Sequence, residues 1–112
     1  MDVNKLVYDK NTVIELKQIL GEYSFYLPDI ADINIKIKLY RYLDRNDICF
    51  DTNYFIQTPT QIGPYITSNN FASTEEIALE SGIKTITSYY QKALAEGHKP
   101  EKSWFIKNTD YW

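Results

Sequence analysis

The chain has 112 residues, with 12 basic and 15 acidic side chains, a formal net charge of −3, one histidine and one cysteine. This length fits one domain, residues 1–112, and the hydrophobic content of 44% is ordinary for a soluble protein, which argues against a disordered or membrane-inserted chain. The acidic balance disfavours nucleic acid as a partner, because domains that bind it usually carry a basic surface.

The first predicted element is a short N-terminal helix over residues 11–21, "NTVIELKQILG". Thr12 and Glu15 have the spacing of a capping box, and Gly21 is a suitable helix stop. A helix this short needs an apolar face that docks on the rest of the domain. The apolar residues at helical spacing are Leu16, Ile19, Leu20 and Tyr23.

Residues 33–57 predict a β-hairpin. The stretch "DINIKIKLYRYL" alternates apolar and polar residues, which is the period of a half-buried strand. "DRND" at 44–47 supplies turn-forming residues, and "ICFDTNYFIQT" returns to β-branched and aromatic residues. Residues 57–71 then contain two prolines and a glycine, which suits a loop or an edge strand near 65–67.

A long helix is predicted over residues 74–96. Ser73 and Glu76 have capping-box spacing at its start. Ala78 and Gly82 have almost no side chain, and because an interior glycine weakens a helix, we expect a strand or a partner helix to pack closely there. The predicted apolar stripe is Leu79, Ile83, Ile86, Tyr90 and Ala93 or Leu94.

The segment after the long helix predicts its end and one more strand. Gly97 is expected to stop the helix, with His98 near the negative helix end and Pro100 just beyond. "SWFIKN" then indicates a final short strand that runs back along the sheet and buries Trp104 or Phe105. The remaining "TDYW" is an aromatic tail.

These elements predict an α+β fold. An antiparallel sheet of about four strands, centred on the hairpin, is covered on one face by the long helix in the C-terminal half, with the short N-terminal helix beside it. Strands that precede the helix as a run argue against a parallel α/β arrangement.

Familiar catalytic and cofactor motifs are absent from the sequence. One cysteine and one histidine cannot build a Cys/His zinc site within one chain, and the four isolated glycines form no phosphate-binding loop. We therefore expect no metal and no cofactor, and a non-enzymatic role is favoured. Cys49, between Ile48 and Phe50, is expected to be buried. The N-terminal sequence lacks a secretory signal, so the expected location is the cytoplasm.

His98 has two interpretations. As a general base it would need a nucleophile or an orienting carboxylate, and the sequence offers Glu96 and Glu101 nearby but no serine elbow or thiol partner. As a structural residue it would interact favourably with the last helical carbonyls. We favour the structural interpretation.

The hairpin supplies one candidate binding surface. The segment "KIKLYRYLDR" at 36–45 carries Lys36 and Lys38 and the only two arginines of the chain, Arg41 and Arg45, together with Tyr40 and Tyr42. Single-stranded nucleic acid or a protein partner would stack on such aromatic, basic residues. The alternative is a solvated strand face whose lysines discourage edge aggregation.

The 57–71 loop supplies a second candidate. Gln61, Tyr65 and Asn69 are placed to line a small-molecule pocket against the start of the long helix at Ser73, where backbone amides also favour anions.

Ten tyrosines and two tryptophans shape the functional prediction, because these residues are enriched at interfaces. The leading hypothesis is a small non-catalytic binding or regulatory protein that contacts protein partners, or copies of itself, through aromatic-rich surface. The places where an exposed patch is expected are Tyr89 with Tyr90, "NYF" at 53–55, and Tyr111 with Trp112. The alternative is a small-molecule-binding domain or small enzyme at the 57–71 loop. A third is single-stranded nucleic-acid binding at residues 36–45.

Overall fold

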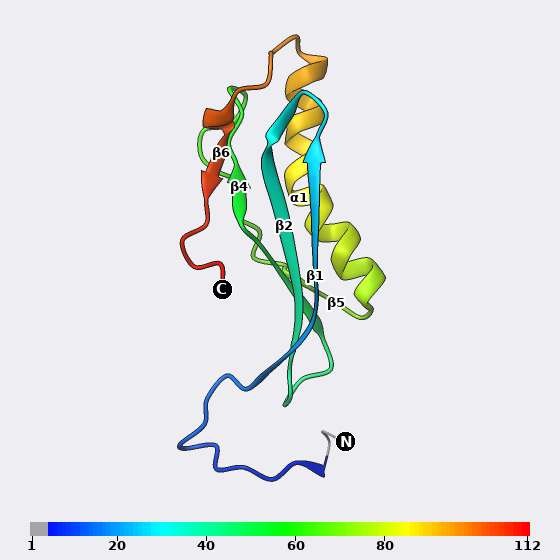
Figure 1. Ribbon diagram of the computed structural model, residues 1–112, viewed down its shortest axis with the longest axis vertical. Helices are drawn as coiled ribbons and strands as arrows, with labels where there is room; N and C mark the ends of the chain where they lie inside the picture. Colours follow the sequence, from blue (N-terminus) through cyan, green and yellow to red (C-terminus); the bar gives the residue numbers. More distant parts are fainter. Residues whose placement is uncertain (1–4) are drawn as a thin grey trace.

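The computed structural model describes residues 5–112. The molecule is elongated, 54 Å long against 25 and 23 Å in the other directions, and Figure 1 shows residues 5–16 lying at one end as an arm. The elements are β1 (Lys17–Leu27), β2 (Ile30–Tyr42), β3 (Ile48–Thr52), β4 (Tyr54–Ile56), β5 (Phe71–Ala72), α1 (Glu75–Ala95), a 3₁₀ turn (Lys102–Trp104) and β6 (Phe105–Lys107).

The main sheet has four antiparallel strands in the order β1-β2-β3-β5. β1 and β2 form a long hairpin that runs from Leu27 opposite Ile30 to Lys17 opposite Tyr42. The pairing of β2 with β3 confirms an antiparallel hairpin in the predicted region. α1 packs on one face of this sheet, over β2 and β3, which gives the α+β architecture (Figure 1).

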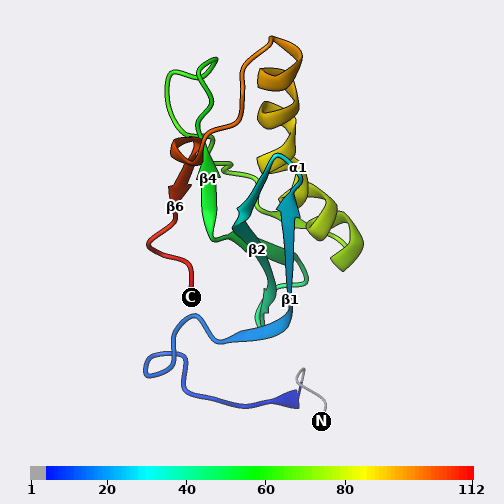
Figure 2. The ribbon, with the colours of Figure 1, turned by 45° about the horizontal axis from the view of Figure 1, so that its top comes forward.

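β4 and β6 form a separate two-stranded sheet (Figure 2). The final strand predicted from "SWFIKN" is therefore present, but it pairs with β4 and not with the main sheet. Both Trp104 and Phe105 are buried. In the 57–71 loop, Tyr65 forms a single isolated bridge to Ile56, and the edge strand predicted near 65–67 does not extend beyond this bridge. The described part of the chain has no helix that is both long and apolar enough to cross a membrane.

The core lies between α1 and the alternating apolar residues of β2. Ile35, Ile37 and Leu39 are fully buried, as the alternation predicts. Gly82 of α1 sits so close to the sheet that an added Cβ would lie 3.0 Å from Ile37 Cγ2 and 3.3 Å from Phe50 Cδ2. The close packing expected at this glycine is confirmed, and strands supply it.

The predicted N-terminal helix over 11–21 is wrong. Residues from Lys17 onward form β1, and Thr12 does not cap a helix but donates its hydroxyl proton to Asp9 Oδ2 at 2.7 Å. Glu15 has a φ of 52°, which a helix does not tolerate, and Gly21 lies beside a register shift within β1. A short helix is marginal in water, whereas a strand gains a full ladder of hydrogen bonds from β2.

The long helix is confirmed, with one correction at its start. Thr74, not Ser73, is the N-cap, and its Oγ1 accepts a hydrogen bond from the Ile77 amide at 3.2 Å. At the other end Gly97 has a φ of 91°, and the His98 amide donates to the Ala93 carbonyl at 3.0 Å. This is the glycine-terminated helix end that the sequence predicts.

Candidate functional site

The sheet face opposite α1 carries aromatic rings, lysines and carboxylates, and residues 108–112 cross it. Side chains alternate along a strand, so Lys38 and Tyr40 point away from α1 while their neighbours Ile37 and Leu39 point toward it. We call residues 108–112 the tail. The surface beneath it, the tail face, comprises Lys17, Glu22, Lys38, Tyr40 and Asp51.

Two lysines hold the aromatic rings of the tail. Lys17 Nζ lies 4.3 Å from the ring centroid of Trp112 and 5.2 Å from that of Tyr40. Lys38 Nζ lies 4.5 Å from the Trp112 centroid and 4.8 Å from the Tyr111 centroid. These distances are within the range of attraction between a cation and a ring face. The rings of Trp112 and Tyr40 also meet edge to face at 5.1 Å.

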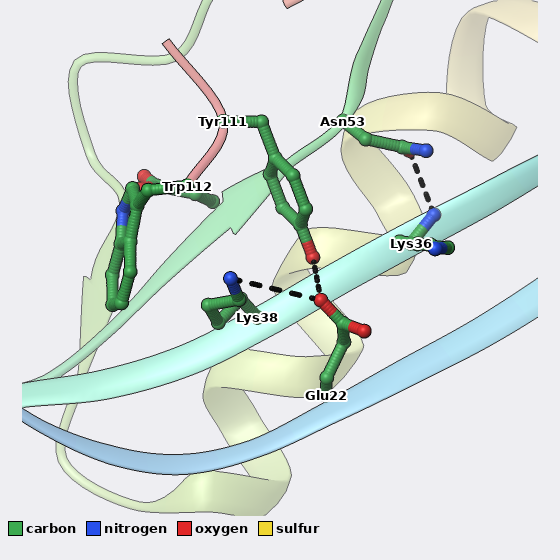
Figure 3. Close-up of polar contacts among 7 residues, drawn as sticks. Glu22, Lys36, Lys38, Asn53, Tyr111 and Trp112 are labelled. Carbon is green, nitrogen blue, oxygen red and sulfur yellow. Dashed lines mark hydrogen bonds and ion pairs between the residues drawn. The ribbon is translucent and has the colours of Figure 1, made fainter.

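Two carboxylates accept the polar hydrogens of the same rings. The Tyr111 hydroxyl donates to Glu22 Oε2 at 2.6 Å, and Lys38 Nζ lies 3.7 Å from that oxygen (Figure 3). Trp112 Nε1 donates to Asp51 Oδ2 at 2.8 Å. Tyr111 and Trp112 therefore each have a lysine ammonium group near the ring and a carboxylate that accepts a hydrogen bond from the polar end of the side chain.

These contacts shift three pKa values. The hydrogen bond from Tyr111, helped by Lys38, holds the pKa of Glu22 below its usual value of 4.5. Partial burial and the same bond raise the pKa of Tyr111, and partial burial with the nearby Asp51 raises that of Tyr40. At neutral pH the Glu22 carboxylate is therefore charged, and the hydroxyl groups of Tyr111 and Tyr40 are neutral.

The structure brings together three of the four hairpin residues singled out by sequence. Tyr40 is buried and meets Tyr42 edge to face at 5.7 Å, and the Arg45 guanidinium lies 5.0 Å from the Tyr42 ring. Arg41 has the opposite parity to these tyrosines and donates to Gln18 Oε1 at 3.0 Å. Much of the predicted aromatic surface is thus engaged by the chain's own side chains.

A groove of about 440 Å³ runs between α1 and the 57–71 loop. Of the predicted loop residues, Tyr65 and Asn69 line it, and Tyr65 meets Tyr89 of α1 with ring centroids 5.1 Å apart. Its helical wall is the middle of α1, including Lys84 and Thr85, and not the helix start at Ser73.

Gln61 and His98 lie elsewhere. The Gln61 amide closes its own loop, donating to the Ile56 carbonyl at 3.0 Å and accepting from the Thr58 amide at 2.7 Å. His98 is exposed beyond the end of α1.

The outer edge of β1 is the third surface. Among residues 5–112, β1 is paired on one side only, by β2. Three large side chains on it are exposed: Ile19 by 59%, Tyr23 by 46% and Tyr26 by 55%. The aromatic patch expected from sequence is different, because Tyr90 is buried in the core and Tyr89 is half-buried.

Sequence reasoning missed Lys17 and Glu22 of the tail face, because both lay in or beside the segment read as a helix. One signal was available, since "YSFYL" at 23–27 is rich in aromatic residues that favour strands. Trp112 was identified as part of an aromatic tail, but its partners come from distant strands, which a local pattern does not reveal.

Comparison with known proteins found no relative: no family model, no curated protein and no solved structure matches this chain. The functional argument therefore depends on the geometry of the three surfaces.

Proposed function

We propose that this is a non-catalytic binding protein that self-associates through the outer edge of β1. The observation that carries the proposal is that Ile19, Tyr23 and Tyr26 are exposed on the long strand whose outer side is unpaired within residues 5–112. An unpaired edge presents N–H and C=O groups that pair readily with another chain. A second copy is the partner that makes such a contact self-complementary.

The register of β1 supports a symmetric pairing. Register shifts between Ile19 and Gly21 and between Phe25 and Leu27 leave residues 21–25 as the regular stretch. Two such stretches that pair antiparallel about Tyr23 bring the two Tyr23 side chains together. The same register sets Glu22 opposite Ser24, so like charges do not face each other across the strands.

The arm supplies further contact area. Five paired residues alone fall short of the roughly 1,000 Å² that a specific interface buries. Val7 and Ile14 of the arm are largely exposed, and the arm leads directly into β1. In the proposed dimer these apolar side chains pack on the second copy.

Light scattering across a concentration series tests the assembly. We expect a dimer that Tyr23→Lys converts to a monomer with unchanged circular dichroism, because Tyr23 is half exposed and its loss leaves the core intact. The matched control is Ile62→Lys, which makes the same charge change at a fully exposed position in the 57–71 loop and should remain dimeric. A monomeric wild-type protein at all concentrations would overturn the proposal.

Cysteine crosslinking tests the register. Directly opposed residues of antiparallel strands have Cα atoms about 4.5–5.5 Å apart, which a disulfide spans. Tyr23→Cys should therefore oxidise to a covalent dimer, whereas Ser24→Cys, offset from its own copy along the strand, should not. The native Cys49 is buried, so the wild-type chain gives the background level of crosslinking. Equal crosslinking at both positions would refute pairing centred on residue 23.

The groove beside α1 favours a second candidate function, small-molecule binding. Its volume is within the usual range for ligand sites, and it combines aromatic walls with hydroxyl and amide groups. The probe we would use is anilinonaphthalene sulfonate, an aromatic anion. We expect saturable fluorescence that Tyr65→Ala weakens and Tyr26→Ala, outside the groove, does not. Equal signals from the two variants would exclude the groove as the binding site.

A further inference from the structure

We propose that the tail face is a docking site for peptide segments that carry neighbouring tyrosine and tryptophan side chains. The chain's own tail occupies this site as a removable latch. The tail face lies on the side of the sheet opposite α1 and shares Lys17 and Glu22 with β1, whereas the proposed self-association uses the backbone edge of that strand. This inference therefore concerns a different partner from the one proposed above.

The chemistry of the tail face selects aromatic side chains that also donate a hydrogen bond. Lys17 and Lys38 present cations to the rings, which any aromatic residue satisfies. Glu22 accepts a hydrogen bond from the Tyr111 hydroxyl (Figure 3), and Asp51 accepts one from the Trp112 indole N–H. A phenylalanine side chain has no such donor. A bound phenylalanine would leave both carboxylates without these donors, so the site discriminates in favour of tyrosine and tryptophan.

The latch is held in a way that permits exchange. The tail's backbone is tied to the sheet at Asn108, whose amide donates to the Asn53 carbonyl at 2.9 Å. Beyond Asn108, the hydrogen bonds that the described residues make to the sheet come from the side chains of Tyr111 and Trp112. Trp112 remains 38% exposed, and exposed ionic and cation–ring contacts are individually weak.

Release of the latch would expose a surface suited to a partner. Tyr40 is only 4% exposed with Trp112 against it, and Tyr42 stands edge to face beside it. Removing Trp112 uncovers these rings and frees Lys17 and Lys38. A peptide with the same side chains would replace the lost contacts from outside.

Fluorescence anisotropy with a labelled peptide tests the proposal. The peptide Lys-Asn-Thr-Asp-Tyr-Trp repeats residues 107–112, and its control has alanine in place of the last two residues. The full chain with Tyr111→Ala and Trp112→Ala lacks the latch. We expect it to bind the peptide saturably and about tenfold more tightly than the wild type, because the wild-type tail competes as a tethered ligand.

Two further variants keep the result decisive. In the latch-free background, Lys38→Ala should weaken binding at least several-fold because it removes the cation between the two rings. Tyr111→Phe in the intact chain removes one hydrogen bond of the latch and should bind the peptide more tightly than wild type, even if the double variant does not fold. The proposal is overturned if the folded latch-free chain binds the two peptides equally, or if Tyr111→Phe binds no better than wild type.

Discussion

Gly82→Ala should destabilise the protein, although alanine is the better helix former. The gain in helix propensity is about 1 kcal/mol. Against it, the new Cβ would lie 3.0 Å from Ile37 Cγ2 and 3.3 Å from both Ile37 Cδ1 and Phe50 Cδ2. Carbon atoms prefer about 3.5–4.0 Å, and overpacking of a filled core costs about 1–3 kcal/mol. We expect a net loss of about 1 kcal/mol.

Urea unfolding measures this loss as a lower midpoint with an unchanged slope. Gly63→Ala is the matched control, because nothing lies within 4 Å of the new Cβ, and it should be neutral or slightly stabilising. In a double-mutant cycle, Ile37→Ala should cost less in the Gly82→Ala background, since the clashing branch is gone. A Gly82→Ala protein that is more stable than wild type would refute the argument that the helix and sheet are in tight contact here.

Two further outcomes follow from the helix end and the tail. Gly97→Ala places a Cβ at a φ of 91° and should cost about 1–2 kcal/mol in thermal unfolding, whereas Gly97→Asn, a residue that tolerates positive φ better, should cost less; equal losses would contradict the strain argument. The lowered pKa of Glu22 means that its stabilisation of the tail is present above pH 4.5 and is lost as the pH falls through the lowered value. Acrylamide quenching of Trp112 should therefore rise on acidification below pH 4.5, and Glu22→Gln should show raised quenching already at neutral pH; a flat profile in wild type would contradict a role for this carboxylate.

The elements that sequence predicts correctly are those whose local pattern and tertiary burial agree. The strict alternation of Ile33, Ile35, Ile37 and Leu39 matches a strand with one face on the core. The glycine stop of α1 is a local signal, whereas the N-cap lies one residue later than the predicted Ser73, at Thr74. The apolar stripe of α1 is displaced toward its small residues: Ala78 and Gly82 are buried, while Ile83 is 36% exposed. The stripe was predicted mainly from the large apolar side chains of α1, whereas the close approach of this helix to the sheet buries its smallest residues most deeply.

The tail face depends on pairings that local sequence does not encode. Glu22 and Tyr111 are separated by 89 positions, and Asp51 and Trp112 by 61. Each residue type is ordinary where it stands in the chain. Only the β1–β2–β3 register places two carboxylates and two lysines under the tail, so the candidate site could not be predicted before the sheet topology was known.

The misreading of β1 and the proposed self-association have one physical origin. Leu16, Ile19, Leu20 and Tyr23 recur at the spacing that would gather them on one face of a helix. In a strand the same spacing sends side chains to both faces, and the cross-strand pairs set Ile19 opposite Tyr40 on the tail face and Tyr23 opposite Ile37 on the α1 face. Because β1 lies at an edge of the sheet, neither face buries them fully. Within the described chain, these apolar residues share no single buried face. A second copy paired along this edge would cover them, and the native mass of the Tyr23→Lys variant, compared with that of the wild type, tests whether it does.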